Sequence, residues 1–348
     1  MPLTPRHGVR DARPLPLRRH SRAVVVTGVL LLTGLLAARP VDAGSTLGTP
    51  QGFGARTTGG NGAPPVFVTS LADSGPGTLR EAVERPKPAE IHFRVAGTIV
   101  LRTHLWVRSQ KTIDGRGPYP VTISNRGLIL AQSNVIVESL RFDHFGDPTV
   151  PDNPQDAIEI RGARRVWISH NRFSNAADKA IQVTSGTDIT VSGNHFRMQS
   201  QVFQVGCYSC PDGDAIRVSV HDNYFEGGDR GYRMPTVNYG YVHAWNNYLV
   251  HWAYFGMAST RVGRLLTQGN VFEAGAWKRA AVPDTHTPEG KDPRDGYLRS
   301  VGDLRLNGAV IDENEPWQVT NPPYTAAVRR ASTSLADSIA AAAGPRPA

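Results

Sequence analysis

The sequence contains only two cysteines, Cys207 and Cys210, separated by two residues. Two thiolates cannot complete a structural zinc site, which uses four ligands. A thioredoxin-like redox centre is disfavoured because the flanking residues lack the βαβ pattern that such a centre needs. If the chain is exported, the remaining interpretation is a local disulfide between Cys207 and Cys210.

Long apolar runs are also lacking beyond residue 38, so no membrane span is expected in the rest of the chain. Residues 1–22 hold six arginines and one acidic residue, residues 23–38 are apolar, and residues 41–43 form a small-residue cleavage site. This order predicts a secretory signal peptide over residues 1–43 and a secreted, extracellular protein. Arg18 and Arg19 leave the twin-arginine export route open beside the general one.

A strong excess of positive charge is lacking once the signal peptide is set aside. That segment supplies +5 of the net +8 through seven arginines and two aspartates, which leaves +3 on the other 305 residues. So small an excess does not give the basic footprint of a nucleic-acid-binding protein. It is compatible with an acidic polymer as the partner.

Several catalytic motifs are missing as well. The glycine-rich turns at residues 52–56 and 58–62 are not followed by the Gly-Lys-Ser/Thr of a phosphate-binding loop. The nucleophile elbow of serine hydrolases is absent, which disfavours that class of enzyme. Acidic pairs exist, but sequence spacing alone does not set the carboxylate separation that a glycoside hydrolase needs.

What the sequence does contain is a repeat from about residue 130 onward. Five of six short β-rich runs are followed by an asparagine and, two residues later, by a large apolar residue. The pairs are Asn171/Phe173, Asn194/Phe196, Asn223/Phe225, Asn247/Leu249 and Asn270/Phe272. The asparagine spacings of 23, 29, 24 and 23 residues are typical of a solenoid. Without a helical pattern between the runs, the prediction is an all-β, right-handed parallel β-helix.

The repeated asparagines predict a ladder of stacked side-chain amides that hydrogen-bond along the solenoid axis and satisfy backbone groups. The alternative is that each asparagine marks an independent turn. The spacing of 29 marks an insertion that carries both cysteines, and residues 146–154 form a second insertion. Insertions in solenoids usually build the binding face.

Helices are expected at both ends of the solenoid. Residues 74–83 are typical of a turn and a short helix that caps the N-terminal coil, whose strand edges are otherwise exposed. Residues 326–343 are alanine-rich with Leu335 and Ile339 four apart, which favours a helix that packs back on the coil. We therefore expect a β-helix domain over residues 44–322, then a C-terminal helix and a disordered tail over residues 323–348.

The stretch Arg233-Met-Pro-Thr-Val-Asn238 precedes alternating residues that predict a strand entered through a rigid turn. An arginine there presents a fixed cation suited to a carboxylate, although an ordinary surface arginine is the alternative. The stretch resembles the Arg-x-Pro-x-x-Arg signature of family 1 polysaccharide lyases, the pectate lyases. Further matches follow in order at residues 52–55, 74–80, 111–117, 166–170, 240–243, 246–247, 268–270 and 299–308.

The resemblance covers roughly residues 52–344 and implies a secreted lyase that cleaves polygalacturonate or a related uronate polysaccharide. The implied reaction is β-elimination, in which calcium stabilises the charge that develops on the uronate. The implied partner is an acidic polysaccharide, without nucleic acid or membrane, and we expect a monomer.

The resemblance also assigns roles to residues. Asp156 and Asp178 match calcium-binding acids, and Arg233 matches the arginine that removes the proton. Three further positions match substrate-binding residues; they are Gln201, Pro235 and Asn238. Arginine is an awkward base because its free pKa is above 12, so nearby cations are needed to make the neutral form accessible.

The sequence departs from the family pattern at four charged positions. Acids are replaced at Pro154 and Gln182, and cations are replaced at Gln201 and Asn238. Fewer charges predict calcium that is weakly bound or arrives with substrate. Candidates to compensate are Asp152, Lys179, Arg197 and Arg217. The departures keep two alternatives open, a non-catalytic polysaccharide-binding β-helix and a calcium-independent lyase for methyl-esterified pectin.

Overall fold

The computed structural model describes residues 49–346 apart from residues 147–154, 198–199, 208–212, 229 and 284–295. These residues belong to one compact unit, Gly44–Ala348. The predicted signal peptide, Asp152, Pro154 and Cys210 lie outside the described residues. Within the described part of the chain, α-helix is confined to α1 (Leu79–Glu84) and α2 (Thr333–Ala342), and strands dominate the rest.

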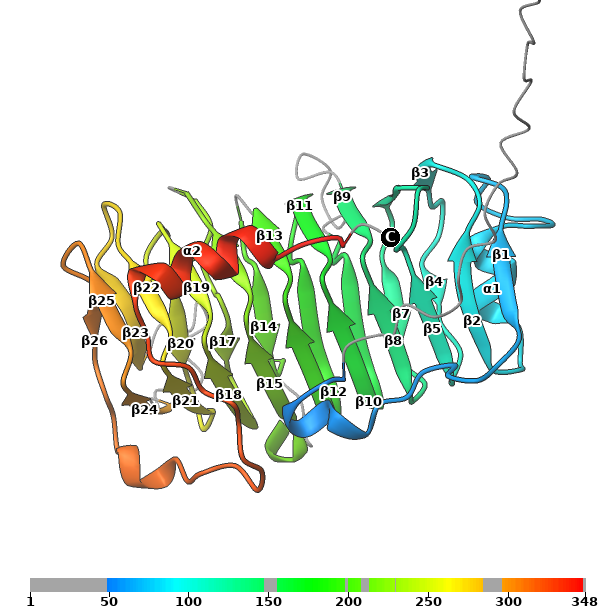
Figure 1. Ribbon diagram of the computed structural model, residues 1–348. Coiled ribbons are helices and arrows are strands. Elements are labelled where there is room, and N and C mark those ends of the chain that lie inside the picture. Colours follow the sequence, from blue (N-terminus) through cyan, green and yellow to red (C-terminus); the bar gives the residue numbers. More distant parts are fainter. Residues whose placement is uncertain are drawn as a thin grey trace, which may run out of the picture. The chain divides into compact units, whose positions relative to one another are not determined.

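The strands form three rows of parallel neighbours, and from β2 onward each coil of the chain contributes to all three (Figure 1). The first row is β1 (Pro65–Val68), β2 (Ala89–Phe93), β5 (Lys111–Asp114), β8 (Val135–Glu138), the second half of β10 (Ile158–Ser169) and of β12 (Ile181–Ser192), β15 (Arg217–His221), β18 (Tyr241–Trp245), β21 (Arg264–Gln268) and β24 (Tyr297–Val301).

The second row, called the site row below, shares β10 and β12 with the first because these two long strands bend from one row into the other. It consists of β4 (Leu105–Trp106), β7 (Leu128–Leu130), the first halves of β10 and β12, β14 (Phe203–Val205), β17 (Thr236–Val237), β20 (Met257–Ser259), β23 (Arg279–Pro283) and β26 (Val310–Ile311). The third row is β3 (Gly97–Val100), β6 (Val121–Asn125), β9 (Arg141–Phe145), β11 (Arg172–Ala176), β13 (His195–Arg197), β16 (Tyr224–Glu226), β19 (Tyr248–Val250), β22 (Val271–Glu273) and β25 (Leu304–Leu306).

Stacked phenylalanines fill the interior beneath the third row. The rings of Phe142, Phe173, Phe196 and Phe225 are nearly parallel, with successive centroids 4.9, 5.0 and 4.7 Å apart. These separations match the 4.7–4.9 Å between neighbouring strands, so a residue repeated once per coil stacks on its own copy. The repeated apolar position in the sequence is therefore the core position of each coil.

The predicted asparagine ladder is confirmed. The backbone N and Nδ2 of Asn171 donate to Oδ1 of Asn194, at 2.9 and 3.1 Å. The same pair of bonds joins Asn194 to Asn223, Asn223 to Asn247, and Asn247 to Asn270. Asp303, which the repeat did not reveal, ends the ladder by accepting both bonds from Asn270. The asparagines therefore form one continuous hydrogen-bonded ladder rather than a set of independent turns.

The N-terminal capping helix is confirmed as α1. Thr78 caps it by accepting a hydrogen bond from the Glu81 backbone N, and the Glu81 carboxylate accepts one from Gly77 N at 2.7 Å. This pair differs from a capping box only in that Glu81 accepts from Gly77, the residue before the N-cap, and not from Thr78 itself. The buried residues Leu79 and Val83 belong to the core, and the helix packs against β1, β2 and β4.

The C-terminal helix is also confirmed, but it is shorter than predicted. It begins after Ser332, which caps it by accepting a bond from Leu335 N, and not at residue 326. The preceding segment is held extended because Arg329 exchanges two backbone hydrogen bonds with the Asn246 side chain. Helix α2 buries Leu335 and Ile339 and packs against β19 and β22 (Figure 1).

Within the described residues, none of the helices has the length and apolar character needed to cross a membrane.

Candidate active site

Four polar residues occupy matching places in four successive coils, just before the strands of the site row. They are Asp156, Lys179, Gln201 and Arg233, and they are called the polar line below. Backbone hydrogen bonds set this alignment. Ala157 N donates to Lys179 O, and Val202 N donates to Tyr232 O, so Gln201 lies opposite Tyr232 and Arg233 lies one residue further on. With strands roughly 4.8 Å apart, the line covers about 14 Å along the axis.

A second set of side chains runs beside the polar line, on the strands themselves. Glu159 pairs with Gln182, Gln182 with Gln204, and Gln204 with Thr236 across β10, β12, β14 and β17. Their strand neighbours Ile158 and Ile181 are fully buried in the core. Since successive side chains point to opposite faces of a strand, the polar set lies on the face opposite the core, although Gln182, Gln204 and Thr236 are themselves buried.

Lys179 joins the two predicted calcium-binding acids. Its Nζ lies 3.4 Å from Oδ1 of Asp156 and makes a short contact with Oδ2 of Asp178. The backbone N of Lys179 also donates to Asp156 Oδ1, at 3.1 Å. The side chains of Asp156, Asp178 and Lys179 are only 14, 24 and 11 % exposed. The structure thus brings the two acids together around an ammonium group.

Burial raises the pKa of Asp156 to about 6, and the Lys179 ammonium opposes this effect. The carboxylates of Asp178 and Glu159 reinforce the rise. Glu159 behaves in the opposite way: burial raises its pKa, but hydrogen bonds from Arg161 and Thr184 outweigh burial and leave that pKa below its usual value. Their neighbours therefore leave the pKa of Asp156 raised and the pKa of Glu159 lowered.

Arg233 is oriented by two glutamines from the neighbouring coil. Its Nη1 donates to Oε1 of Gln204 at 2.6 Å and, in a shorter contact, to Oε1 of Gln201. Its guanidinium also lies 5.4 Å from the centroid of the Tyr232 ring. Gln204 is itself fixed, because its Nε2 donates to Gly206 O. Gln201 thus contacts the predicted catalytic arginine.

Two of the predicted substrate-binding residues are buried. Asn238 is 2 % exposed, its Nδ2 donates to Gly206 O, and its Oδ1 accepts from Thr260 Oγ1. Pro235 is buried and its carbonyl accepts a hydrogen bond from Ala258 N. Both residues are engaged in the scaffold, so their contacts lend no support to substrate binding.

Cys207 is disulfide-bonded. Its predicted partner Cys210 lies outside the described residues, so the pairing itself stays a prediction. Asp152, the candidate to replace a lost calcium ligand, lies outside them too.

A calcium ion needs six to eight oxygen ligands at 2.3–2.6 Å. Asp156 and Asp178 both contact the Lys179 ammonium, and Glu159 is bound by Arg161 and Thr184. In the part of the chain that the structure describes, no group of three or more His, Cys, Asp or Glu side chains is arranged to hold a metal. These residues do not fit a resident calcium ion.

Sequence reasoning named Lys179 only as one of several cations that could compensate for a lost one, and it missed Gln204 as a member of the site. Both carried a signal in the repeat. Lys179 follows Asp156 by 23 residues, which is one coil period, and Gln204 follows Gln182 by 22. Residues one period apart lie in neighbouring coils of a solenoid, so the spacing places each pair in adjacent coils, while the strand register decides which side chains touch.

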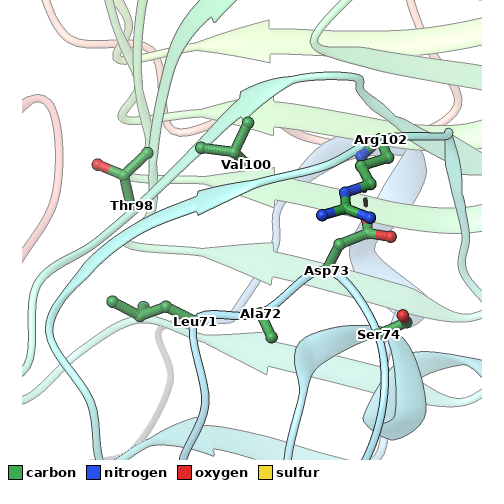
Figure 2. Close-up of a pocket in the computed structure, with 7 residues that line it drawn as sticks. All are labelled: Leu71, Ala72, Asp73, Ser74, Thr98, Val100 and Arg102. Carbon is green, nitrogen blue, oxygen red and sulfur yellow. Dashed lines mark hydrogen bonds between the residues drawn. The ribbon is translucent and has the colours of Figure 1, made fainter.

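A cavity of about 410 Å³ lies at the other end of the described strands and is unrelated to this site. Figure 2 shows its lining, in which the Asp73 carboxylate accepts a hydrogen bond from Arg102 N. The remaining lining residues are Leu71, Ala72, Ser74, Thr98 and Val100. None of the predicted site residues contributes to it.

The fold is a parallel β-helix that carries a line of charged and amide side chains along one row of strands. The pectate lyase family model matches residues 96–346. The chain is 33 % identical over 317 residues to "Probable pectate lyase 9" of Arabidopsis thaliana, covering 84 % of this chain and 70 % of that protein. It is 33 % identical over 295 residues to "Pectate lyase 1" of Juniperus ashei, covering 78 and 80 %.

Solved structures give the same result for the fold. The cedar pollen allergen Jun a 1 superposes with a TM-score of 0.72 at 28 % identity, covering 85 % of this chain and 92 % of that chain. The lyase Bsp165PelA from Bacillus sp. N165, solved with trigalacturonate, gives a TM-score of 0.67 at 21 % identity over 85 and 98 %. The predicted right-handed parallel β-helix is confirmed. The chain belongs to the pectate lyase family and is a polysaccharide lyase.

Proposed function

We propose that this lyase cleaves polygalacturonate or a closely related uronate polymer at the polar line. The observation that carries the proposal is the orientation of Arg233 by Gln201 and Gln204, at the end of a line that also holds Lys179. A polymer lying along the axis contacts several coils at once, and the line offers it cations from two of them. A uronate carboxylate is the partner that such cations select.

The reaction is an elimination, which is general to the family. A base removes the proton on the carbon next to the carboxylate, and the electron pair of that C–H bond forms a carbon–carbon double bond. The bond from the adjacent carbon to the glycosidic oxygen breaks, and that oxygen leaves with the electron pair and takes up a proton. The charge that builds on the carboxylate before the bond breaks needs a nearby cation.

Arg233 is the proposed base. Two amide oxygens, from Gln201 and Gln204, fix the direction of its guanidinium. Such fixing holds a catalytic group at the distance and angle that proton transfer requires. Gln201 and Gln204 are therefore positioning residues in this proposal, because each acts on the substrate through Arg233.

Calcium, when bound, stabilises the developing charge in this family. The described acids do not fit a resident ion, so no step of the mechanism is assigned to calcium here. Binding of calcium by Asp156 and Asp178 stays a prediction from the resemblance.

The test is incubation of residues 44–348 with polygalacturonate while the ultraviolet absorbance of the 4,5-unsaturated product is recorded. We expect R233A to lower the rate by about 10²- to 10⁴-fold, the usual contribution of a general base. The matched control is R305A, because Arg305 is an exposed arginine on β25 in the third row. Absence of product from every uronate polymer, with R233A equal to wild type, contradicts the proposal and favours a non-catalytic binding protein.

We also propose that the protein is exported and works outside the cell as a monomer. The order of basic, apolar and small residues over residues 1–43 supports this, and members of the family are typically secreted. The exported protein is expected to begin at Gly44 by mass spectrometry and to elute from a sizing column as a single chain. An intact N-terminus on the exported protein contradicts the cleavage site.

A further inference from the structure

We infer that Lys179 takes the place of a resident calcium ion, so that its ammonium is the fixed cation that holds Asp156 and Asp178 and stabilises the uronate. The inference deepens the proposed function and rests on it for the role toward substrate. The role toward calcium stands on the contacts of Lys179 alone.

The contacts of Lys179 are those expected of a bound cation. Its Nζ contacts carboxylate oxygens of both Asp156 and Asp178, which come from different coils. Its backbone N adds a second hydrogen bond to Asp156. Two nearly buried carboxylates repel each other and lose hydration, so a positive charge between them is needed to keep both ionised. Lys179 supplies that charge from within the chain.

The fold holds Lys179 in this place. Its residue is 9 % exposed, and it immediately precedes Ala180, which is fully buried. The next residue, Ile181, pairs with Ile158 of β10, which fixes Lys179 one coil beyond Asp156. Ser200 fixes the same turn from the other side by donating to the carbonyls of Ala176 and Asp178. Because these contacts hold the backbone of Lys179 in place, its ammonium keeps its position without a metal.

The neighbouring residues match this interpretation. Gln182, one of the positions where the family pattern has an acid, carries no charge, and its buried Nε2 has no hydrogen-bond partner among the described residues. A calcium ion at Asp156 and Asp178 would have to displace the ammonium, and these two described carboxylates would offer it four oxygens, fewer than it needs. The single positive charge of Lys179 faces two acidic side chains here. In the family pattern it would face three or four, which one positive charge balances less completely.

The experiment measures calcium binding directly, by calorimetry and by the shift of melting temperature with added CaCl2. Wild type is expected to bind no calcium up to millimolar concentration. In K179A, Asp156 and Asp178 are released, so calcium should bind at least 10-fold more tightly than to wild type and raise the melting temperature, because a ligand of the native state stabilises it. K278A is the matched control, since the Lys278 ammonium donates to the carbonyls of Gly275 and Asn307.

An activity measurement gives the second readout. Wild-type cleavage of polygalacturonate is expected to change less than 2-fold when a chelator is added. K179A should lose at least 10-fold without calcium and regain rate when calcium is added, while K179R should retain most of the rate. K179M, which keeps the length of the stem, replaces K179A if the latter fails to fold.

Two results overturn the inference. One is micromolar calcium binding by wild type that is lost in D156N. The other is a K179A or K179M protein that folds and binds calcium no better than wild type. If wild type cleaves no uronate polymer, the proposed function fails, but the calorimetric comparison still decides whether Lys179 occupies the calcium position.

Discussion

The Nη1 atom of Arg233, in the turn before β17, donates to the side-chain oxygen of Gln204 on β14 at 2.6 Å. The bond joins a turn residue to a buried strand residue whose own amide is anchored on Gly206. Arg233 also has a left-handed backbone, with φ of 63°. Uncommon backbone conformations persist where surrounding contacts hold them, and here the side chain is held as well.

Without the side-chain oxygen of Gln204, the guanidinium of Arg233 should therefore be held less firmly in place. We expect Q204L to lower kcat by about 10- to 100-fold, since a misplacement of about 1 Å in a catalytic group has an effect of this size. KM should change less than 3-fold, because Gln204 acts through Arg233 and does not hold the polymer. Steady-state kinetics on polygalacturonate separate the two constants.

Q132A is the control, because Gln132 accepts a hydrogen bond from Ser109 in an exposed part of the first coils. A Q204L variant with the wild-type kcat contradicts the positioning role.

The asparagine ladder should contribute measurably to the free energy of unfolding. In N194A, Asn171 loses its acceptor and the Asn194 amide no longer satisfies Ile168 O. Unsatisfied buried groups cost about 1–3 kcal/mol each, so the free energy of unfolding should fall by about 3 kcal/mol or more. Denaturant unfolding measures the loss. The exposed Asn61 provides the control, and N61A should stay within about 0.5 kcal/mol of wild type.

Glu138 should make stability depend on pH. It is fully buried, both its oxygens lack hydrogen-bond partners among the described residues, and burial raises its pKa to about 7. Arg116 and Arg346 only partly oppose this rise. Because the native pKa lies above the unfolded value, the folded protein binds the proton more tightly. Stability is then greatest below pH about 4.5 and is lost as pH rises to about 7, by up to about 3 kcal/mol from this group.

The variant E138Q isolates this effect because glutamine stays neutral at every pH. Its stability should lie close to that of wild type at pH 4 and above it at pH 8, as followed by denaturant unfolding at both values. The exposed Glu84 provides a control, and E84Q should retain the wild-type dependence. Parallel curves for E138Q and wild type across this range rule out the assignment.

Substrate choice offers a further test of the polar line. Arg233 and Lys179 favour free carboxylates, so polygalacturonate should be cleaved at least 10-fold faster than highly methyl-esterified pectin. Added salt should reduce the rate on polygalacturonate, since exposed charges are screened over about 10 Å at 0.1 M. A preference for esterified pectin that survives chelation identifies a pectin lyase and contradicts the assigned substrate class.

Much of the fold was predictable because one residue pattern repeats with the coil. The spacing from Asn171 to Asn194 fixes the coil length, and Phe173 and Phe196 fix which side faces the core. The start of α2 was not predictable, since alanine-rich propensity favours helix from residue 326 onward. The tertiary contact between Arg329 and Asn246, 83 residues apart, overrides that preference.

The site was predictable only where single residues match the family. Arg233, Asp156 and Asp178 were named in this way and their roles stay predictions, while Asn238 and Pro235 are matches whose side chains the fold buries. Lys179 was considered only as one of several spare cations. Its position between two acids depends on the register of β10 and β12, which sequence alone does not supply.

The most direct test of the account is the mass of the fragments that wild type and R233A release from polygalacturonate. Elimination predicts new non-reducing ends that are one water lighter than hydrolysis products, formed by wild type and at least 100-fold more slowly by R233A. Fragments with the mass of hydrolysis products, or equal rates from the two proteins, contradict β-elimination by Arg233.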